Sequence, residues 1–288
     1  MKIGIISNLD KDKDQLITKQ VISWLEERNI QVYFDEKISS ELALIKDNYC
    51  DAYIFKHSDI IIVLGGDGTL LNVARQASCN GVPLFGINLG HLGFLTETEV
   101  GDMYASMEKL IRGDYSIEKR MMLEAFIRND NEPTKDFIAL NDIVVAKGNF
   151  SRLLTYSIFI NDNFVDEYSG DGIIVCSPTG STAYSLSAGG PIVAPDVEVL
   201  LITPVCPHTL HSRSILVSNK DLVKIELDAN CKTDVILTVD GQTGVSINPS
   251  DVVTVKQSIY YANLIKLNNR SFFDVLRAKM SERRDNNK

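Results

Sequence analysis

Residues 59–78 read DIIIVLGGDGTLLNVARQAS, and this stretch decides the fold of the first part of the chain. Residues 59–64 form an apolar, β-branched run that predicts a buried strand. Residues 70–78 carry apolar side chains at helical spacing, and a glycine-rich loop at residues 65–69 joins the two segments. A strand, a glycine-rich loop and a helix in this order are typical of a parallel α/β sheet, in which ligands bind at the carboxyl ends of the strands.

The segments around this stretch alternate in the same way. Short β-branched runs predict strands over residues 2–7, 30–34 and 82–88, and apolar periodicity predicts helices over residues 14–29 and 100–112. Strands separated by helices indicate right-handed crossovers and a mostly parallel sheet. We therefore expect an α/β domain in residues 1–118.

The pattern changes near residue 118. Short β-like runs follow, at residues 123–128, 143–146, 153–161, 172–176, 215–217, 222–227, 235–239 and 252–256. Strands at this spacing predict an antiparallel sandwich or layered sheet, interrupted by one helix over residues 181–187. A charged helix is predicted over residues 271–284. We expect a β-rich domain in residues 119–264, packed closely against the first domain, with the ligand in the cleft between them.

Composition narrows the class of protein. The chain has 288 residues and a formal net charge of -9, which argues against a general nucleic-acid-binding surface. Its sequence shows no apolar run of membrane-spanning length and no signal peptide. Five scattered cysteines without a CxxC pair predict reduced thiols and a cytoplasmic protein. His208 and His211 form a pair for which the sequence offers no third metal ligand, so we interpret them as structural.

The loop at residues 65–69 consists of Gly65, Gly66, Asp67, Gly68 and Thr69. Glycines let a backbone approach phosphate closely, and the N-terminus of the following helix favours anions. A carboxylate repels phosphate unless it binds a metal or accepts a proton from a substrate hydroxyl; the alternative is a tight turn capped by the aspartate. The chain contains neither a Walker A motif nor G-x-G-x-x-G, so a triphosphate would be held without the usual lysine.

Two further segments carry polar groups suited to a nucleotide. Gly170-Asp171-Gly172 and the hydroxyl-rich block at residues 177–190, SPTGSTAYSLSAGG, can hydrogen-bond a base, a ribose or a phosphate, or the block can simply cap a helix. Asn141-Asp142 interrupts the apolar stretch at residues 138–145. The amide can read an adenine edge and the carboxylate can accept from ribose hydroxyls. A surface turn explains this pair equally well.

Taken together, these segments resemble the NAD kinase family. The resemblance rests, in the family's order, on residues 65–69, NLGHLGFL at 88–95, Asn141-Asp142, residues 170–172, the block at 177–190 and VDGQ at 239–242. It extends over residues 1–275. Diacylglycerol kinases share the Gly-Gly-Asp-Gly motif and phosphofructokinases carry a close relative of it, whereas the block at residues 178–190 is specific to NAD kinases.

The resemblance implies transfer of the γ-phosphoryl group of ATP, or of a phosphoryl group from polyphosphate, to the 2′-hydroxyl of the adenosine ribose of NAD, forming NADP. The family's fold is a Rossmann-like (phosphofructokinase-like) N-terminal domain, to which the last helix at residues 265–288 returns, and a β-rich C-terminal domain. Mg²⁺ or Mn²⁺ would accompany the triphosphate. Family members are dimers or tetramers whose sites borrow residues from a neighbour, so we expect a homodimer or homotetramer.

The resemblance also assigns roles to residues. Asp67 is the expected general base, Asn141 reads adenine, Asp142 holds the ribose diol, and Asp171 holds the nicotinamide carboxamide. Gly65, Gly66, Gly68 and Thr69 hold the donor phosphates. The implied NAD site consists of Asp67, Gly68, Phe94, Asn141, Asp142, Asp171, Thr182, Ala183, Tyr184, Ser187, Cys206 (through its backbone) and Gln242. No metal ligands of the protein's own are expected.

The chain departs from the family at two positions. Ser169 stands where some members have arginine or another polar or basic residue, and Asp142 stands where many have glutamate. Two rival functions remain: a lipid kinase of the diacylglycerol class, which would use the same glycine loop, and a non-catalytic NAD or NADP sensor, which would keep Asn141 and Tyr184 but would not need Asp67. The sequence offers no amphipathic segment suited to a membrane surface.

Overall fold

The computed structural model describes residues 1–35, 38, 50–90, 93–129, 132–148, 153–209, 211–230, 234–267 and 270–285. Within them the chain divides into two compact units, Met1–Lys119 with Ala262–Lys288, and Arg120–Tyr261. None of the helices in these ranges is long and apolar enough to cross a membrane.

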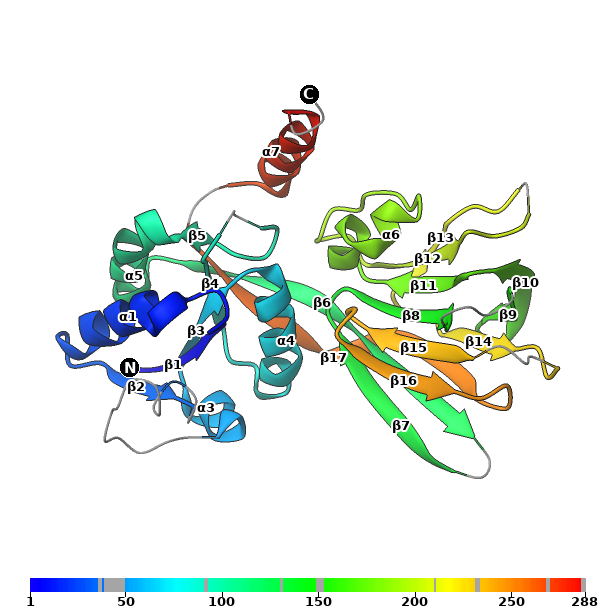
Figure 1. Ribbon diagram of the computed structural model, residues 1–288, viewed down its shortest axis with the longest axis horizontal. Helices are drawn as coiled ribbons and strands as arrows, with labels where there is room; N and C mark the ends of the chain where they lie inside the picture. The colour runs from blue at the N-terminus through cyan, green and yellow to red at the C-terminus, as the bar shows by residue number, and fades with distance from the viewer. Residues whose placement is uncertain are drawn as a thin grey trace. The chain divides into compact units, whose positions relative to one another are not determined.

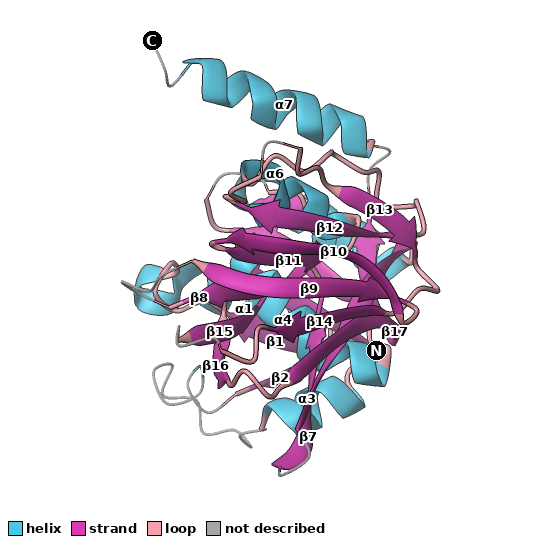
Figure 2. Cartoon of the chain, turned by 90° about the vertical axis from the view of Figure 1, so that its right-hand side faces the viewer, coloured by secondary structure: helices cyan, strands magenta, loops and turns pink. Residues whose placement is uncertain are grey.

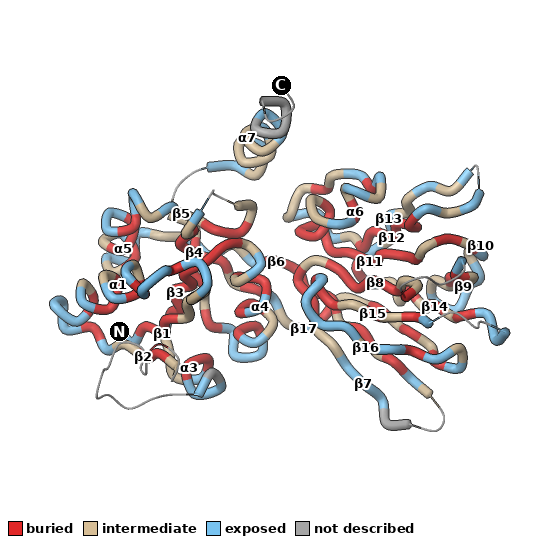
Figure 3. Tube along the Cα trace, viewed as in Figure 1, coloured by how far each residue is buried: buried red, intermediate tan, exposed pale blue. Residues whose placement is uncertain are grey.

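The first unit is built on a parallel sheet. Its strands are β1 (Lys2–Ser7), β2 (Gln31–Phe34), β3 (Ile60–Gly65) and β4 (Leu84–Asn88), in the order β2-β1-β3-β4, and the short β5 (Thr98–Glu99) pairs with β4. The far end of β17 (Val252–Lys266) adds a parallel partner, with Leu264 opposite Leu84. β3 and β4 are buried along their whole length, because helices cover both faces of the sheet (Figure 3).

Those helices pack through apolar stripes. α1 (Leu16–Glu26) and α5 (Met103–Arg112) share one core with one face of β1, β3 and β4. α3 (Asp51–His57) and α4 (Asp67–Ala77) contact the opposite face, where Ile54 and Leu70 lie against Gly4 and Gly86 (Figure 1). Short 3-10 turns precede or follow three of the helices: η1 (Lys13–Gln15), η2 (Ser78–Asn80) and η3 (Val100–Asp102). The last helix, α7 (Phe272–Asp285), follows β17.

The second unit is made of two antiparallel layers (Figure 2). One sheet has the order β13-β12-β11-β8-β15-β16, and the other runs β10-β9-β14-β17 with the β6–β7 hairpin beside β17. A continuous core from both layers, including Tyr156, Ile173 and Leu237, fills the space between them. The strand bounds are β6 (Ser116–Asn129), β7 (Glu132–Ala139), β8 (Asp142–Lys147), β9 (Leu154–Ile160), β10 (Asn163–Gly170), β11 (Gly172–Cys176), β12 (Val199–Val205), β13 (Ile215–Ser218), β14 (Val223–Leu227), β15 (Val235–Val239) and β16 (Thr243–Ile247).

Most predicted elements are confirmed, and several bounds are corrected. β1, β11 and β15 have the predicted bounds, whereas the strand predicted over residues 82–88 begins at Leu84. The helix predicted from residue 70 begins at Asp67, one turn earlier, so Asp67 belongs to the helix and not to the loop. The helix predicted over residues 181–187 is a 3-10 turn, η4 (Thr179–Thr182), followed by the single turn of α6 (Tyr184–Ser187).

Candidate active site

Three loops of the first unit meet at the carboxyl edge of its parallel sheet. The strand registers place Ser7 opposite Leu64 and Gly65 opposite Asn88, so the described residues that follow these strands, 8–12, 65–69, 88–90 and 93–97, all leave the sheet at this edge. Asn8 ties the first two loops together. Its backbone N–H donates to Leu64 O at 2.8 Å, and its side-chain Nδ2 donates to Thr69 Oγ1 at 3.1 Å.

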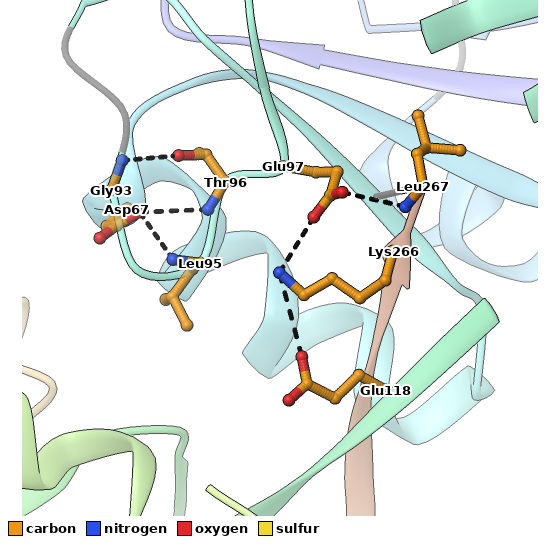
Figure 4. A network of polar contacts seen from close by, with 8 residues as sticks. All are labelled: Asp67, Gly93, Leu95, Thr96, Glu97, Glu118, Lys266 and Leu267. Carbon is orange, nitrogen blue, oxygen red and sulfur yellow. Dashed lines mark hydrogen bonds and ion pairs between the residues drawn. The ribbon is translucent and has the colours of Figure 1, made fainter. Parts of the chain in front are cut away.

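Asp67 is held by the third loop. Its Oδ2 accepts the N–H of Phe94 at 2.8 Å. Its Oδ1 accepts the N–H groups of Leu95 at 3.1 Å and Thr96 at 3.3 Å, the two contacts that Figure 4 shows. The side chain is half-buried. A carboxylate offers about four lone-pair positions, so these three donors leave room for one more. The carboxylate thus binds a second loop instead of capping the turn at residues 65–69, as the alternative interpretation of the sequence held, and it keeps an acceptor position for a ligand.

The loop that binds Asp67 is itself anchored twice. Thr96 Oγ1 accepts from Asn88 Nδ2 and from Gly93 N, both at 3.0 Å. A Cβ at Gly93 would lie 1.9 Å from Asp67 Oδ1, so a side chain here would expel the carboxylate. The Glu97 carboxylate, on a side chain 5% exposed, accepts from Lys266 Nζ at 3.0 Å and from Leu267 N at 2.9 Å, as Figure 4 shows.

Lys11 is a residue of this edge that the sequence interpretation missed. A Cβ placed on Gly66 would lie 3.0 Å from Lys11 Nζ, so the ammonium group stands directly beside the glycine loop. Its backbone N–H donates to the side-chain oxygen of Asn8 at 3.2 Å. The signal was available, because Lys11 follows β1 and the carboxyl ends of neighbouring parallel strands share one edge.

Phe94 lies next to Asp67 in this unit. Its backbone N–H binds the carboxylate, and its half-buried ring lies 6.3 Å, centre to centre, from Phe272 of α7. Two positions of the predicted motif at 88–95, His91 and Leu92, are outside the described residues.

A second group of candidate residues gathers at one edge of the β13–β16 sheet in the second unit. The registers place Asp142 opposite Cys176 and Ile143 opposite Val239. Because these strands are antiparallel, the start of β8 and the ends of β11 and β15 lie at the same edge. The structure thus brings together Asn141-Asp142, the block that begins at residue 177, and Gln242.

Asp142 is the most strongly perturbed acid at this edge. It is 4% exposed, and burial, followed by the charge of Asp240, raises the pKa of its carboxyl to about 7. Asn141 is half-buried and stands one residue before β8. The pair is therefore not a surface turn. Hydrogen bonds donated by a ligand would stabilise a buried carboxylate of this kind, because they offset the cost of removing its charge from water.

The hydroxyl-rich block separates into two classes. The buried hydroxyls of Ser177, Ser181 and Ser185 bind Leu140 O at 2.5 Å, Pro178 O at 2.6 Å and Thr203 Oγ1 at 3.0 Å, and so hold the block in place. The residues that the resemblance singled out are the accessible ones: Thr182, Ala183, Tyr184 and Ser187 are half-buried or exposed, with Tyr184 46% exposed.

Asp171 and Cys206 lie at the opposite edge of the same sheet. Gly172 pairs with Ala146 and with Val205, so both residues stand at the far end of β11 from Asp142. The four residue steps of β11 separate the two edges by roughly 13 Å. Lys147 Nζ lies 2.7 Å from Asp171 Oδ1, which gives Lys147 a partner other than Asp142. Cys206 is exposed and has a φ of +47°.

The departure at Ser169 has a local explanation. The Ser169 hydroxyl lies 2.8 Å from Thr155 Oγ1 across the β9–β10 pair, and its carbonyl accepts the N–H of His208 at 2.8 Å. Ser169 therefore links the two strands of the β9–β10 hairpin through its hydroxyl. Among the residues that the structure describes, no group of three or more His, Cys, Asp or Glu side chains could hold a metal ion.

Comparison with known proteins also divides the chain into an N-terminal and a C-terminal part, with somewhat different bounds. Residues 3–115 match the ATP-NAD kinase N-terminal domain, and residues 140–267 match the ATP-NAD kinase C-terminal domain. The chain is 50% identical over 282 residues to an NAD kinase of Caldanaerobacter subterraneus subsp. tengcongensis, covering 98% of this chain and 99% of the relative.

Solved structures agree on the fold. The crystal structure of yeast NADH kinase complexed with NADH has a TM-score of 0.87 at 25% identity and covers 96% of this chain and 85% of that one. An NAD kinase from Archaeoglobus fulgidus in complex with ATP has a TM-score of 0.75 at 24% identity, covering 97% and 98%.

Proposed function

The chain belongs to the ATP-NAD kinase family, and on this premise we propose which of its residues transfer a phosphoryl group to NAD. It is an NAD kinase in activity, using ATP to phosphorylate the 2′-hydroxyl of the adenosine ribose and form NADP. Its two compact units correspond to the family's two domains in this proposal, with residues 265–288 belonging to the first. The parallel order β2-β1-β3-β4 between helices supports describing that first domain as Rossmann-like.

Asp67 is the proposed general base, and one observation carries this assignment. Its carboxylate is fixed by three backbone N–H groups and still has an acceptor position for a hydroxyl proton. As Asp67 takes the proton, the 2′-oxygen forms its bond to the γ-phosphorus, the bond between that phosphorus and the bridging oxygen breaks, and ADP leaves with the electron pair. Such positioning supplies most of the catalysis in phosphoryl transfer.

The donor phosphates are proposed to bind at the glycine loop. Gly65, Gly66, Gly68 and Thr69 stand at the N-terminus of α4, which favours anions, and Lys11 adds a positive charge beside Gly66. The lysine that the motif lacks is thus supplied by another loop. A divalent ion fits a site without a protein cage if it arrives on the triphosphate, held by phosphate oxygens and water. Once bound, that ion neutralises phosphate charge.

NAD is proposed to bind at the Asp142 edge of the second unit. Asn141 reads the adenine, Asp142 accepts from the ribose diol, and the accessible residues Thr182, Ala183, Tyr184 and Ser187 with Gln242 surround the dinucleotide. The burial of Asp142 supports this proposal, because hydrogen bonds donated by the ribose hydroxyls would stabilise a carboxylate that is shielded from water. Gly68 and Phe94, the neighbours of Asp67 in the first unit, are the remaining members of the proposed NAD set.

Asp171 and Cys206 are proposed to act in the site of a neighbouring copy of the chain. Their place at the far edge of the sheet supports this, because it separates them from Asp142 within one subunit. Mixed oligomers of Asp67→Asn and Asp171→Ala subunits test it. If sites are shared, a mixed dimer regains one intact site and activity rises above that of either parent; activity that never exceeds the parents would show that each subunit works alone.

A coupled assay tests the function as a whole. The chain is incubated with ATP, Mg²⁺ and NAD, and an NADP-specific dehydrogenase then reports the product. NADP formation is expected, and the same assay with polyphosphate in place of ATP identifies the donor. Tight NAD binding without NADP formation would instead indicate a sensor.

Asp67→Asn tests the catalytic assignment. We expect kcat to fall by about 10²–10⁴-fold, the usual range for loss of a general base. Because Asp67 also holds a loop, Thr96→Val is the matched control: it removes the acceptor for Asn88 and Gly93 and loosens the same loop without touching the carboxylate. An equal loss of kcat in both variants would assign Asp67 to loop positioning alone.

A further inference from the structure

Asp240 makes an unusual set of contacts for a turn residue. It follows β15 directly, is 9% exposed, and has a φ of +50°. Its Oδ1 accepts the N–H of Asn141 at 2.7 Å and that of Asp142 at 3.1 Å, while its Oδ2 accepts the N–H of Leu140 at 3.1 Å. Its own N–H donates to Asp142 O at 2.9 Å. One side chain thus binds three successive backbone groups of another segment.

The other side of that segment is held by the hydroxyl-rich block. Ser177 Oγ donates to Leu140 O at 2.5 Å, and Ser177 N donates to Asn141 O at 2.9 Å. A Cβ at Gly180 would lie 2.1 Å from Asn141 O, so the block packs directly on this carbonyl. The N–H groups of residues 140–142 therefore face Asp240, and two of their carbonyls face the block. The backbone cannot turn, which leaves the side chains of Asn141 and Asp142 in fixed directions.

A carboxylate is well suited to this task but has a second effect. Charged acceptors make shorter and stronger hydrogen bonds to backbone N–H groups than neutral ones do. The same negative charge stands beside Asp142 and adds to burial in raising the pKa of that carboxyl. The titratable groups that face Asp142 are Asp240, after β15, and Cys176 at the end of β11.

We propose that Asp240 is a positioning residue for NAD: it fixes the backbone of residues 140–142 and thereby aims Asn141 at the adenine and Asp142 at the ribose diol. The proposal rests on the function assigned above to Asn141 and Asp142. Asp240 itself touches no substrate. The competing view is that it caps the β15–β16 turn and affects stability alone.

Asp240→Asn separates these views. The amide keeps one acceptor oxygen but replaces the other with a donor that faces N–H groups, so the segment at residues 140–142 loosens and the negative charge is gone. We expect KM for NAD to rise about tenfold, while kcat and KM for ATP stay within about threefold, since roughly one hydrogen bond to a charged group is lost. The pH at which KM for NAD begins to rise should also move to lower pH, because the like charge beside Asp142 is removed.

Asp251→Asn is the matched control. Asp251 is a buried aspartate of the same unit, 6% exposed, and it also fixes a turn, accepting from Asn248 N at 2.7 Å and from Asn129 Nδ2 at 2.6 Å. This variant should lower the thermal midpoint but leave KM for NAD and its pH profile unchanged. If Asp240→Asn behaves like Asp251→Asn, Asp240 is a turn cap and the proposal is wrong.

Two further variants test the proposal if Asp240→Asn does not fold, and separate the role of Asp240 from that of Asp142. Should Asp240→Asn fail to fold, Asp240→Glu retains the charge on a longer arm; it should raise KM for NAD while keeping the original pH midpoint, and an unchanged KM would overturn the proposal. Asp142→Ala tests the underlying assignment. If Asp142→Ala leaves KM for NAD unaltered, the assigned role of Asp142 fails; if it raises KM while neither Asp240 variant does, only the role of Asp240 fails.

Discussion

Replacing Asp142 by asparagine should stabilise the protein at alkaline pH. The folded state raises the pKa of this carboxyl from 3.8 to about 7, chiefly through burial. The folded protein therefore keeps a proton that the unfolded chain has already released, and the free energy of unfolding falls as pH rises from about 4 to about 7. The shift in pKa corresponds to a loss of about 4 kcal/mol in the free energy of unfolding, and this loss is complete above pH 7. Asparagine has nearly the same shape and does not ionise, so it removes this penalty.

The assay is the thermal midpoint of both proteins at pH 5, 6.5 and 8.5, without NAD. One kcal/mol shifts the midpoint of a domain of this size by roughly 2–4 °C, so Asp142→Asn should melt about 10 °C above the parent at pH 8.5 and only a few degrees above it at pH 5. A difference between the two proteins that does not grow with pH would refute the reasoning. Asp251→Asn serves as the control and should lower the midpoint at every pH.

Four further outcomes are expected. Asp142→Ala should raise KM for NAD about tenfold and leave KM for ATP unchanged; equal losses for both substrates with a lower thermal midpoint would mark Asp142 as structural. In the parent enzyme, KM for NAD should rise as pH falls below about 7, because the protonated carboxyl accepts fewer hydrogen bonds from the ribose. Lys11→Gln should raise KM for ATP about fivefold with little change for NAD, since an exposed charge contributes about 1 kcal/mol to phosphate binding; an unchanged KM for ATP removes Lys11 from the site. EDTA should abolish activity and Mg²⁺ or Mn²⁺ should restore it; turnover in metal-free buffer would contradict this.

The sequence predicted the elements whose pattern is strong. The apolar run before the glycine loop forms β3, and the runs at residues 2–7, 172–176 and 235–239 form β1, β11 and β15 as predicted. Weak patterns were missed for physical reasons. β10 is an edge strand with mostly exposed or half-buried residues, and β12 contains Pro204, which in a sequence argues against a strand. The seven-residue α3 is too short for its apolar periodicity to stand out.

The candidate site shows the same limit. The polar residues that stand out in the sequence were found, but their partners are distant along the chain: Asp67 is bound by residues 94–96, and Asp142 is flanked by Asp240. Periodicity reports on neighbours within one element, whereas these contacts depend on strand register. The alternation between buried and accessible hydroxyls after residue 177 was likewise invisible, because serine and threonine letters do not tell which way a side chain faces.

Because the end of the chain returns to the first unit, that unit can finish folding only after the rest of the chain has been translated. The loop that grips Asp67 continues into Glu97, whose 5% exposed carboxylate binds Lys266 and Leu267. A nascent chain that has emerged from the ribosome only as far as the end of β16 carries the whole glycine loop but leaves Glu97 without these two partners. The first unit to be translated is thus the last to be completed, because its sheet gains its last strand only when the end of β17 pairs with β4.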